Sequence, residues 1–106
     1  EAVVYLEGMA EMMPDNPVLF RRAASIRFGL GLDHQKAGRH REAIAEYRRA
    51  LASAPDNLPA HLNLAVGFHA LGLQDSALKA YRRVLELDPE NETAAENLKM
   101  LVEHNQ

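Results

Sequence analysis

Histidine, serine and glycine are the residues of this chain that could carry catalytic or ligand-binding chemistry. No two of the histidines have the i, i+4 spacing of a helical metal site with a third ligand nearby. The serines lack the flanking glycines of a nucleophile elbow, and no phosphate-binding lysine follows Gly29 and Gly31. We therefore predict that the chain is not an enzyme and has neither a cofactor nor a metal site. The residues considered are His34, His40, His61, His69, His104, Ser25, Ser53 and Ser76.

Paired arginines recur along the chain and would suit a protein that follows a phosphate backbone. The second and third pairs are accompanied by glutamates at helical spacing, which is typical of a solvated helix face. The net charge of −3 also argues against nucleic-acid binding, so we expect no nucleic-acid partner. The pairs are Arg21/Arg22, Arg48/Arg49 and Arg82/Arg83, and the glutamates are Glu42, Glu46 and Glu86.

The composition predicts a small helical protein. The 106 residues suffice for one domain, and 47% hydrophobic residues with no tryptophan indicate a core of alanine and leucine. The absence of cysteine excludes disulfides and fits a reducing compartment. There is neither an apolar run of about 18 residues nor a signal-peptide pattern, so we expect a cytoplasmic location without membrane insertion. Because the first residue is Glu1 rather than methionine, the natural N-terminus could lie upstream.

Three stretches of the chain resemble one another. They are EAVVYLEGMAEMMPDN at 1–16, EAIAEYRRALASAPDN at 42–57 and SALKAYRRVLELDPEN at 76–91. Their prolines, Pro14, Pro55 and Pro89, are separated by 41 and then 34 residues, a period that indicates stacked helical repeats. The seven extra residues of the longer period correspond to about two helical turns, so they lengthen a helix and keep its buried face nearly in phase.

Each period has the residues of a helix, a tight turn, a second helix and a stop. Gly38 and Gly72 stand where the first helix must end, because glycine accepts the left-handed conformation there. The repeated prolines cannot continue the second helix, and Asn57 and Asn91 can cap the helix that follows.

Small residues recur where the two helices of a unit must approach closely. Tyr47 and Tyr81 then fill the space toward the next helix. The small residues that face one another are Gly31 with Ala43 and Ala65 with Ala77.

This pattern resembles the tetratricopeptide repeat. The resemblance implies an all-α fold, a right-handed superhelical array of antiparallel helix pairs, and it covers essentially the whole chain. Arg27, His61 and Ala95 depart from it, since the family prefers tryptophan there. We expect helices at about 1–13, 17–37, 41–54, 58–71, 75–87 and 92–104. The domain then comprises a half repeat at 1–16, a repeat with an extended first helix at 17–57, a repeat at 58–91 and a capping helix at 92–106.

The first predicted helix is apolar on nearly all sides, as a buried helix would be. It therefore needs a cover, which could be an upstream helix, the extension that carries Leu19 and Phe20, or another chain. A possible association surface comprises Val4, Tyr5 and Met12 of this helix together with Phe20 of the extension. Val4, Tyr5 and Met12 align with the outward residues Ala45, Glu46 and Ser53 of the next unit. The inward positions are Ala2, Val3, Leu6, Met9, Ala10 and Met13.

The last segment, ETAAENLKMLVEHNQ, begins like another first helix, with Leu98 aligned with Leu64 and Val102 with Phe68. Lys99 replaces the small residue of the earlier units. A terminal helix with a charged outer face is what repeat arrays require as a cap.

The resemblance implies a concave surface, lined by the first helices, that holds a protein or peptide partner. Carried over by position, an apolar floor comprises Phe28, Leu32, Leu62, Val66 and Met100, with polar neighbours Gln35, Lys36, Asn63, His69 and Asn97. Glu96 and Glu103 belong to the same face of the last helix. Such a strip suits an amphipathic helix or an extended apolar segment. The alternatives are that the strip is core, or that the chain's own extension fills it.

Family members that bind acidic chaperone tails use a clamp of lysine, arginine and asparagine. The matching positions here are Phe28, Leu32, Asn63, Thr93 and Asn97, and only Asn63 agrees with the clamp. The sequence thus favours a protein-interaction module with another partner chemistry. The alternatives are a module for self-association or docking onto a longer chain, and a regulatory domain of an upstream enzyme.

Overall fold

The structure is a computed structural model that describes residues 2–104, without the side chain of His104. These residues form six helices and no strand, so the predicted all-α class is confirmed. Residues 1, 105 and 106, the outer limits of the first and last predicted segments, lie outside the described part. The helices are α1 (Ala2–Met12), α2 (Pro17–Lys36), α3 (His40–Ser53), α4 (Leu58–Ala70), α5 (Gln74–Leu87) and α6 (Glu92–His104).

Asparagine begins each of the helices α2, α4 and α6. The side chain of Asn16 accepts a hydrogen bond from the backbone N–H of Val18 at 3.2 Å. Asn57 and Asn91 do the same for helices α4 and α6, at 3.0 and 2.9 Å. These bonds satisfy N–H groups that have no partner within their own helix, which is why the chain starts a helix after each asparagine.

Glycine ends α2 and α4, as predicted. Gly38 and Gly72 have φ angles of 77° and 76°, the left-handed region that a side chain disfavours. The next N–H reaches back five residues in both turns: Arg39 donates to the carbonyl of His34 at 2.8 Å, and Leu73 to that of Phe68 at 2.9 Å. The two turns therefore have the same geometry and send α3 and α5 back along their partners.

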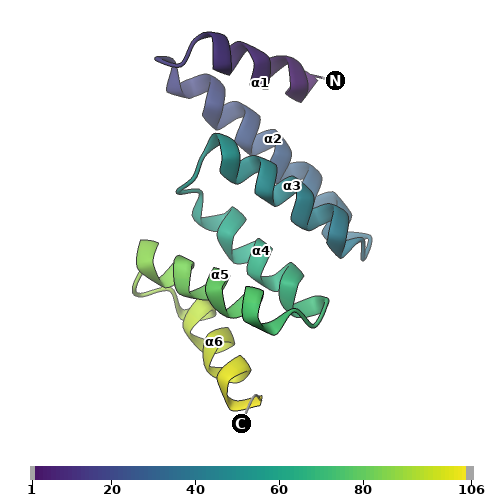
Figure 1. Ribbon diagram of the computed structural model, residues 1–106, viewed down its shortest axis with the longest axis vertical. Helices are drawn as coiled ribbons and strands as arrows, with labels where there is room; N and C mark the ends of the chain where they lie inside the picture. Colours follow the sequence, from purple (N-terminus) through teal and green to yellow (C-terminus); the bar gives the residue numbers. More distant parts are fainter. Residues whose placement is uncertain (1, 105–106) are drawn as a thin grey trace.

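The helices follow one another along the long axis of the molecule, from α1 at one end to α6 at the other (Figure 1). Each helix packs against the next in the sequence, most extensively within the pairs α2–α3 and α4–α5. The result is an elongated α-solenoid of 48 × 29 × 18 Å. A solenoid of this kind has one face made by alternate helices, and that face is the candidate binding surface.

A tyrosine packs at the centre of each helix pair. Tyr47 and Tyr81 have 0% and 1% of their surface exposed. Opposite Tyr47 stands Gly31, where an added Cβ would lie 2.5–3.0 Å from three ring carbons. Helices α2 and α3 thus approach so closely that only glycine fits between the ring and the backbone of α2.

Two details of the predicted ends are wrong. In α1, Val3 and Ala10 are buried, but Ala2 and Met13 are exposed, because among the described residues α1 packs chiefly against α2. In α6, Leu101 is buried like Gly67, with which it aligns, but Val102 is 41% exposed although it aligns with the buried Phe68. Within residues 2–104 no helix follows α6 to cover Val102.

Substitution of Gly31 tests the close approach. Gly31→Ala should lower the free energy of unfolding by about 1–3 kcal/mol, since the buried ring must move to admit the methyl group. Gly29→Ala is the matched control, because nothing lies within 4 Å of its Cβ position. It should raise stability by up to about 1 kcal/mol through helix propensity. Urea unfolding of both variants measures the difference, and equal midpoints would contradict this packing.

Candidate functional site

Helices α2, α4 and α6 carry equivalent residues at a strict spacing of 34. Within each helix the residues are spaced i, i+4 and i+7, so they share one face. They form three rows across the solenoid: Phe28, Leu62 and Glu96; Leu32, Val66 and Met100; Gln35, His69 and Glu103. We call this surface the concave face, and its middle row is apolar on all three helices.

The apolar residues of the concave face are only partly buried. Phe28, Leu32, Leu62 and Val66 are half-buried, and Met100 is 51% exposed. Phe28 and Leu62 also pack against the core, and the Phe28 ring lies 5.6 Å from that of Tyr47. These side chains belong to the core on one side and to a surface strip on the other, so the strip is not simply core.

The concave face continues from α4 to α6. His69 and Met100 line a small cavity of about 200 Å³ together with Gln74 and Leu101. The last two helices of the predicted floor therefore border the same cavity.

Two predicted polar neighbours are engaged by the buried tyrosines. The Tyr47 hydroxyl donates to Gln35 Oε1, and Asn97 Nδ2 donates to the Tyr81 hydroxyl at 3.2 Å. Burial raises the pKa of Tyr47 to about 12 and raises that of Tyr81, so both hydroxyls stay protonated at neutral pH. Of the other predicted polar residues, Asn63 is half-buried, and Lys36 and His69 are exposed.

The extension of α2 builds a separate cavity instead of filling the concave strip. Phe20 is half-buried and lines a cavity of about 650 Å³ with Pro14, Pro17 and the turn between α3 and α4. It also borders a smaller cavity beside Glu7 and Arg49. None of the five apolar floor residues lines either cavity.

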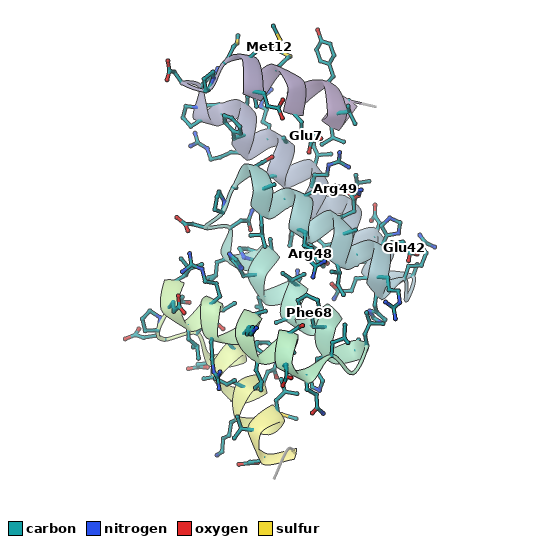
Figure 2. The ribbon with its side chains drawn as sticks, in the orientation of Figure 1. Glu7, Met12, Glu42, Arg48, Arg49 and Phe68 are labelled. Atoms are coloured by element: carbon teal, nitrogen blue, oxygen red, sulfur yellow. The ribbon has the colours of Figure 1, made fainter. Side chains whose placement is uncertain are left out.

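The predicted association surface on α1 is exposed. Val4, Tyr5 and Met12 have 55%, 73% and 84% of their surface exposed, and Met12 lies at the outer edge of the molecule (Figure 2). Glu46 and Ala80, the residues that align with Tyr5, are buried at 7% and 8%. Glu46 and Ala80 are buried because α2 covers α3 and α4 covers α5. Within the described residues, no helix precedes α1 to cover Tyr5 in the same way.

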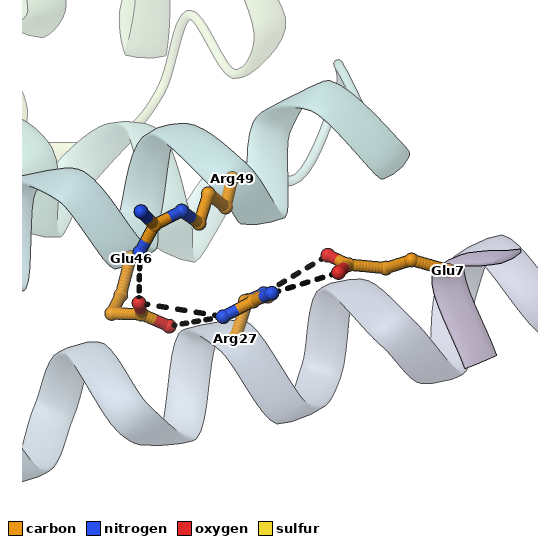
Figure 3. Close-up of polar contacts among 4 residues, drawn as sticks. All are labelled: Glu7, Arg27, Glu46 and Arg49. Carbon is orange, nitrogen blue, oxygen red and sulfur yellow. Dashed lines mark hydrogen bonds and ion pairs between the residues drawn. The ribbon is translucent and has the colours of Figure 1, made fainter. Parts of the chain in front are cut away.

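A buried ion-pair network joins α1, α2 and α3 (Figure 3). Arg27, 8% exposed, donates from Nε and Nη2 to the two carboxylate oxygens of Glu7 at 2.9 and 2.7 Å. Its Nη1 donates to Glu46 Oε2 at 3.2 Å, and Arg49 also donates to Glu46. The bidentate geometry is the strong form of such a pair, and it fixes α1 on the array.

The sequence interpretation missed this network and placed Glu46 outward, which is wrong. Arg27 stands at a position where the resemblance implies a large apolar residue. A charge at an interior position needs a buried partner of opposite sign, and that requirement could have pointed to Glu46.

Among the other paired arginines, Arg83 has a glutamate partner at helical spacing, and Arg83 and Arg48 also contact neighbouring elements. Arg83 pairs with Glu86 at 2.9 Å and with Asp56 at 3.4 Å. Arg48 lies 5.4 Å from the centre of the Phe68 ring, a cation–π contact that ties α3 to α4.

His34 and His61 each contact a nearby residue rather than another histidine. His34 is half-buried and accepts a hydrogen bond from Arg39 at 3.0 Å. His61 Nε2 lies 2.8 Å from the carbonyl oxygen of Pro55. Residues 2–104 contain no group of three histidine, aspartate or glutamate side chains arranged to hold a metal ion. In the same part of the chain, every helix is too short or too polar to cross a membrane.

A family model described as tetratricopeptide repeat matches residues 28–92. The chain belongs to the tetratricopeptide repeat family. The match includes the C-terminal part of α2, all of α3, α4 and α5, and the two glycine turns, which are the parts in which the repeat is regular.

Solved tetratricopeptide domains have the same architecture. The first such domain of Spaghetti (RPAP3), bound to the HSP90 peptide SRMEEVD, is 25% identical, with a TM-score of 0.66 over 97% of this chain and 76% of that one. The first domain of human RPAP3 is 25% identical, with a TM-score of 0.65 over 96% and 75%. The Arabidopsis OM64 domain, at 20% identity and a TM-score of 0.65 over 97% and 79%, shows the fold alone. No curated protein matches the chain significantly.

The Glu7–Arg27 pair predicts a loss of stability in acid. Hydrogen bonding to Arg27 lowers the pKa of Glu7 below its usual value of 4.5, so the stabilisation is complete above that value and is lost as pH falls through the folded-state pKa. At pH 7, Glu7→Gln should cost about 1–2 kcal/mol in urea unfolding. This cost should disappear at low pH, where the wild-type carboxyl is protonated.

Glu11→Gln is the control for that variant, because Glu11 is an exposed residue of the same helix. Its stability should match that of the wild type at every pH. A Glu7→Gln variant as stable as the wild type at pH 7 would show that the pair does not hold α1.

Proposed function

We propose that this domain binds a segment of a partner protein on its concave face. The observation that carries the proposal is the middle row, Leu32, Val66 and Met100, which is apolar on three successive first helices and remains partly open to solvent. An amphipathic helix or an extended segment with apolar anchors would bury this row.

The family supports the general part of the proposal. Tetratricopeptide domains are in general protein-interaction modules rather than enzymes, and the RPAP3 neighbour binds an HSP90 peptide. The finer part rests on this chain's own residues. Phe28, Leu32 and Thr93 carry no charge where the resemblance implies a cationic clamp, so the partner differs in chemistry from an acidic tail.

A second candidate function is assembly through α1. Its exposed Val4, Tyr5 and Met12 form an apolar face at one end of the solenoid, where a second copy or another part of a longer chain could pack. Self-association would appear as a molecular mass that rises with concentration.

Affinity capture with three matched variants tests both functions. Val66→Glu places a charge in the middle row and should remove at least about nine-tenths of the captured partner, because a buried unpaired carboxylate costs more than the contact contributes. Leu73→Glu makes the same kind of change at an exposed turn and should leave capture intact. Circular dichroism must show that each variant is folded.

Tyr5→Glu separates the two candidate functions in the same experiment. A partner that is lost with Tyr5→Glu and retained with Val66→Glu would assign binding to α1 and would contradict the concave-face proposal. The opposite pattern would support it.

A further inference from the structure

We propose that the concave face selects a segment whose apolar residues are flanked on one side by lysine or arginine, with the basic end over α6. This inference rests on the proposed function and goes beyond it, because it specifies the charge of the partner segment and the direction in which it lies. It follows from the distribution of charge across the three rows.

The α6 end of the concave face is acidic. Glu96 and Glu103 lie one helical turn on either side of Met100, at i−4 and i+3, so both carboxylates border the last apolar residue of the middle row. Both side chains are exposed. Within residues 2–104, neither forms an ion pair with another side chain, so both carboxylates are available to a ligand.

The other two helices present no carboxylate in these rows. The residues that align with Glu96 are Phe28 and Leu62, and those that align with Glu103 are Gln35 and His69. Beside these rows, Asp33 and Lys36 are exposed on α2, and Lys99 is exposed on α6. Counted with these neighbours, the formal charge is zero at α2, from Asp33 and Lys36, and −1 at α6, from Glu96, Glu103 and Lys99. The concave face therefore becomes more negative toward α6.

This asymmetry fits one ligand chemistry. Apolar side chains of the segment would cover Leu32 and Val66, and a lysine or arginine beside them would lay its aliphatic stem on Met100 with its charge near Glu96 and Glu103. An acidic segment would meet two like charges at the same place. Complementary charges of this kind determine the choice and orientation of the partner more than they add affinity.

Selection from a surface-displayed library of random peptides, each of about twelve residues, tests the inference directly on the domain. On the wild-type domain, the selected sequences should be enriched in apolar residues with lysine or arginine on one side of them. On the double variant Glu96→Gln and Glu103→Gln, the apolar enrichment should remain and the basic enrichment should disappear. The exposed Glu90→Gln and Glu92→Gln changes, near the start of α6, form the matched control and should leave both enrichments unchanged.

A selected peptide then gives a quantitative measure by fluorescence anisotropy. The double variant should bind it about 3–10-fold more weakly at low salt, as expected for two partly exposed ion pairs. The difference should shrink as salt is added.

The outcomes separate this inference from the proposed function. Apolar sequences without a basic preference, or with an acidic one, would overturn the charge assignment and leave concave-face binding in place. Failure to select any sequence that depends on Val66 would overturn both.

Discussion

The contact between Gly31 and the ring of Tyr47 determines how closely the two helices of a unit approach. The ring is fully buried, and a methyl group on the opposite backbone would overlap it. Ala65 and Tyr81 occupy the equivalent places in the next unit, with no more than 1% exposed. Because both pairs place a small residue opposite a buried tyrosine and both join their helices through the same glycine turn, successive pairs stack in a similar way and form a solenoid.

The concave face is a consequence of that stacking. A spacing of 34 residues brings matched positions of α2, α4 and α6 to one side, so a short pattern in sequence becomes a row across three helices. Phe28 and Leu62 support the row from the core, and the amides of Gln35 and Asn97 are held by the buried tyrosines. The proposed binding surface is thus supported by packed and hydrogen-bonded side chains, an arrangement that lowers the entropic cost of ordering them on binding.

Much of the fold could be predicted from the sequence because the same residue types recur wherever the repeat needs a close helix contact, a turn or a helix cap. Small residues, glycine turns, prolines and asparagine caps each have one structural role, and the six helices follow from them. The network around Arg27 could not be predicted in the same way. It depends on Glu7 in a helix that departs from the repeat, and on which of several glutamates lies within reach of a buried guanidinium. Glu46 was predicted to point outward because the pattern of inward and outward positions along α3 does not reveal that Arg27 of α2 lies opposite it. The concave site itself stays a prediction, because its use by a partner is a matter of binding and not of fold.

Amide chemical shifts of the labelled domain, recorded while a captured partner segment is added, test the central claim most directly. We expect the largest changes on the rows of α2, α4 and α6, around Leu32, Val66 and Met100, with α1 unaffected. Changes concentrated at Val4, Tyr5 and Met12, with the concave rows unmoved, would show that this domain acts through its end and not through its concave face.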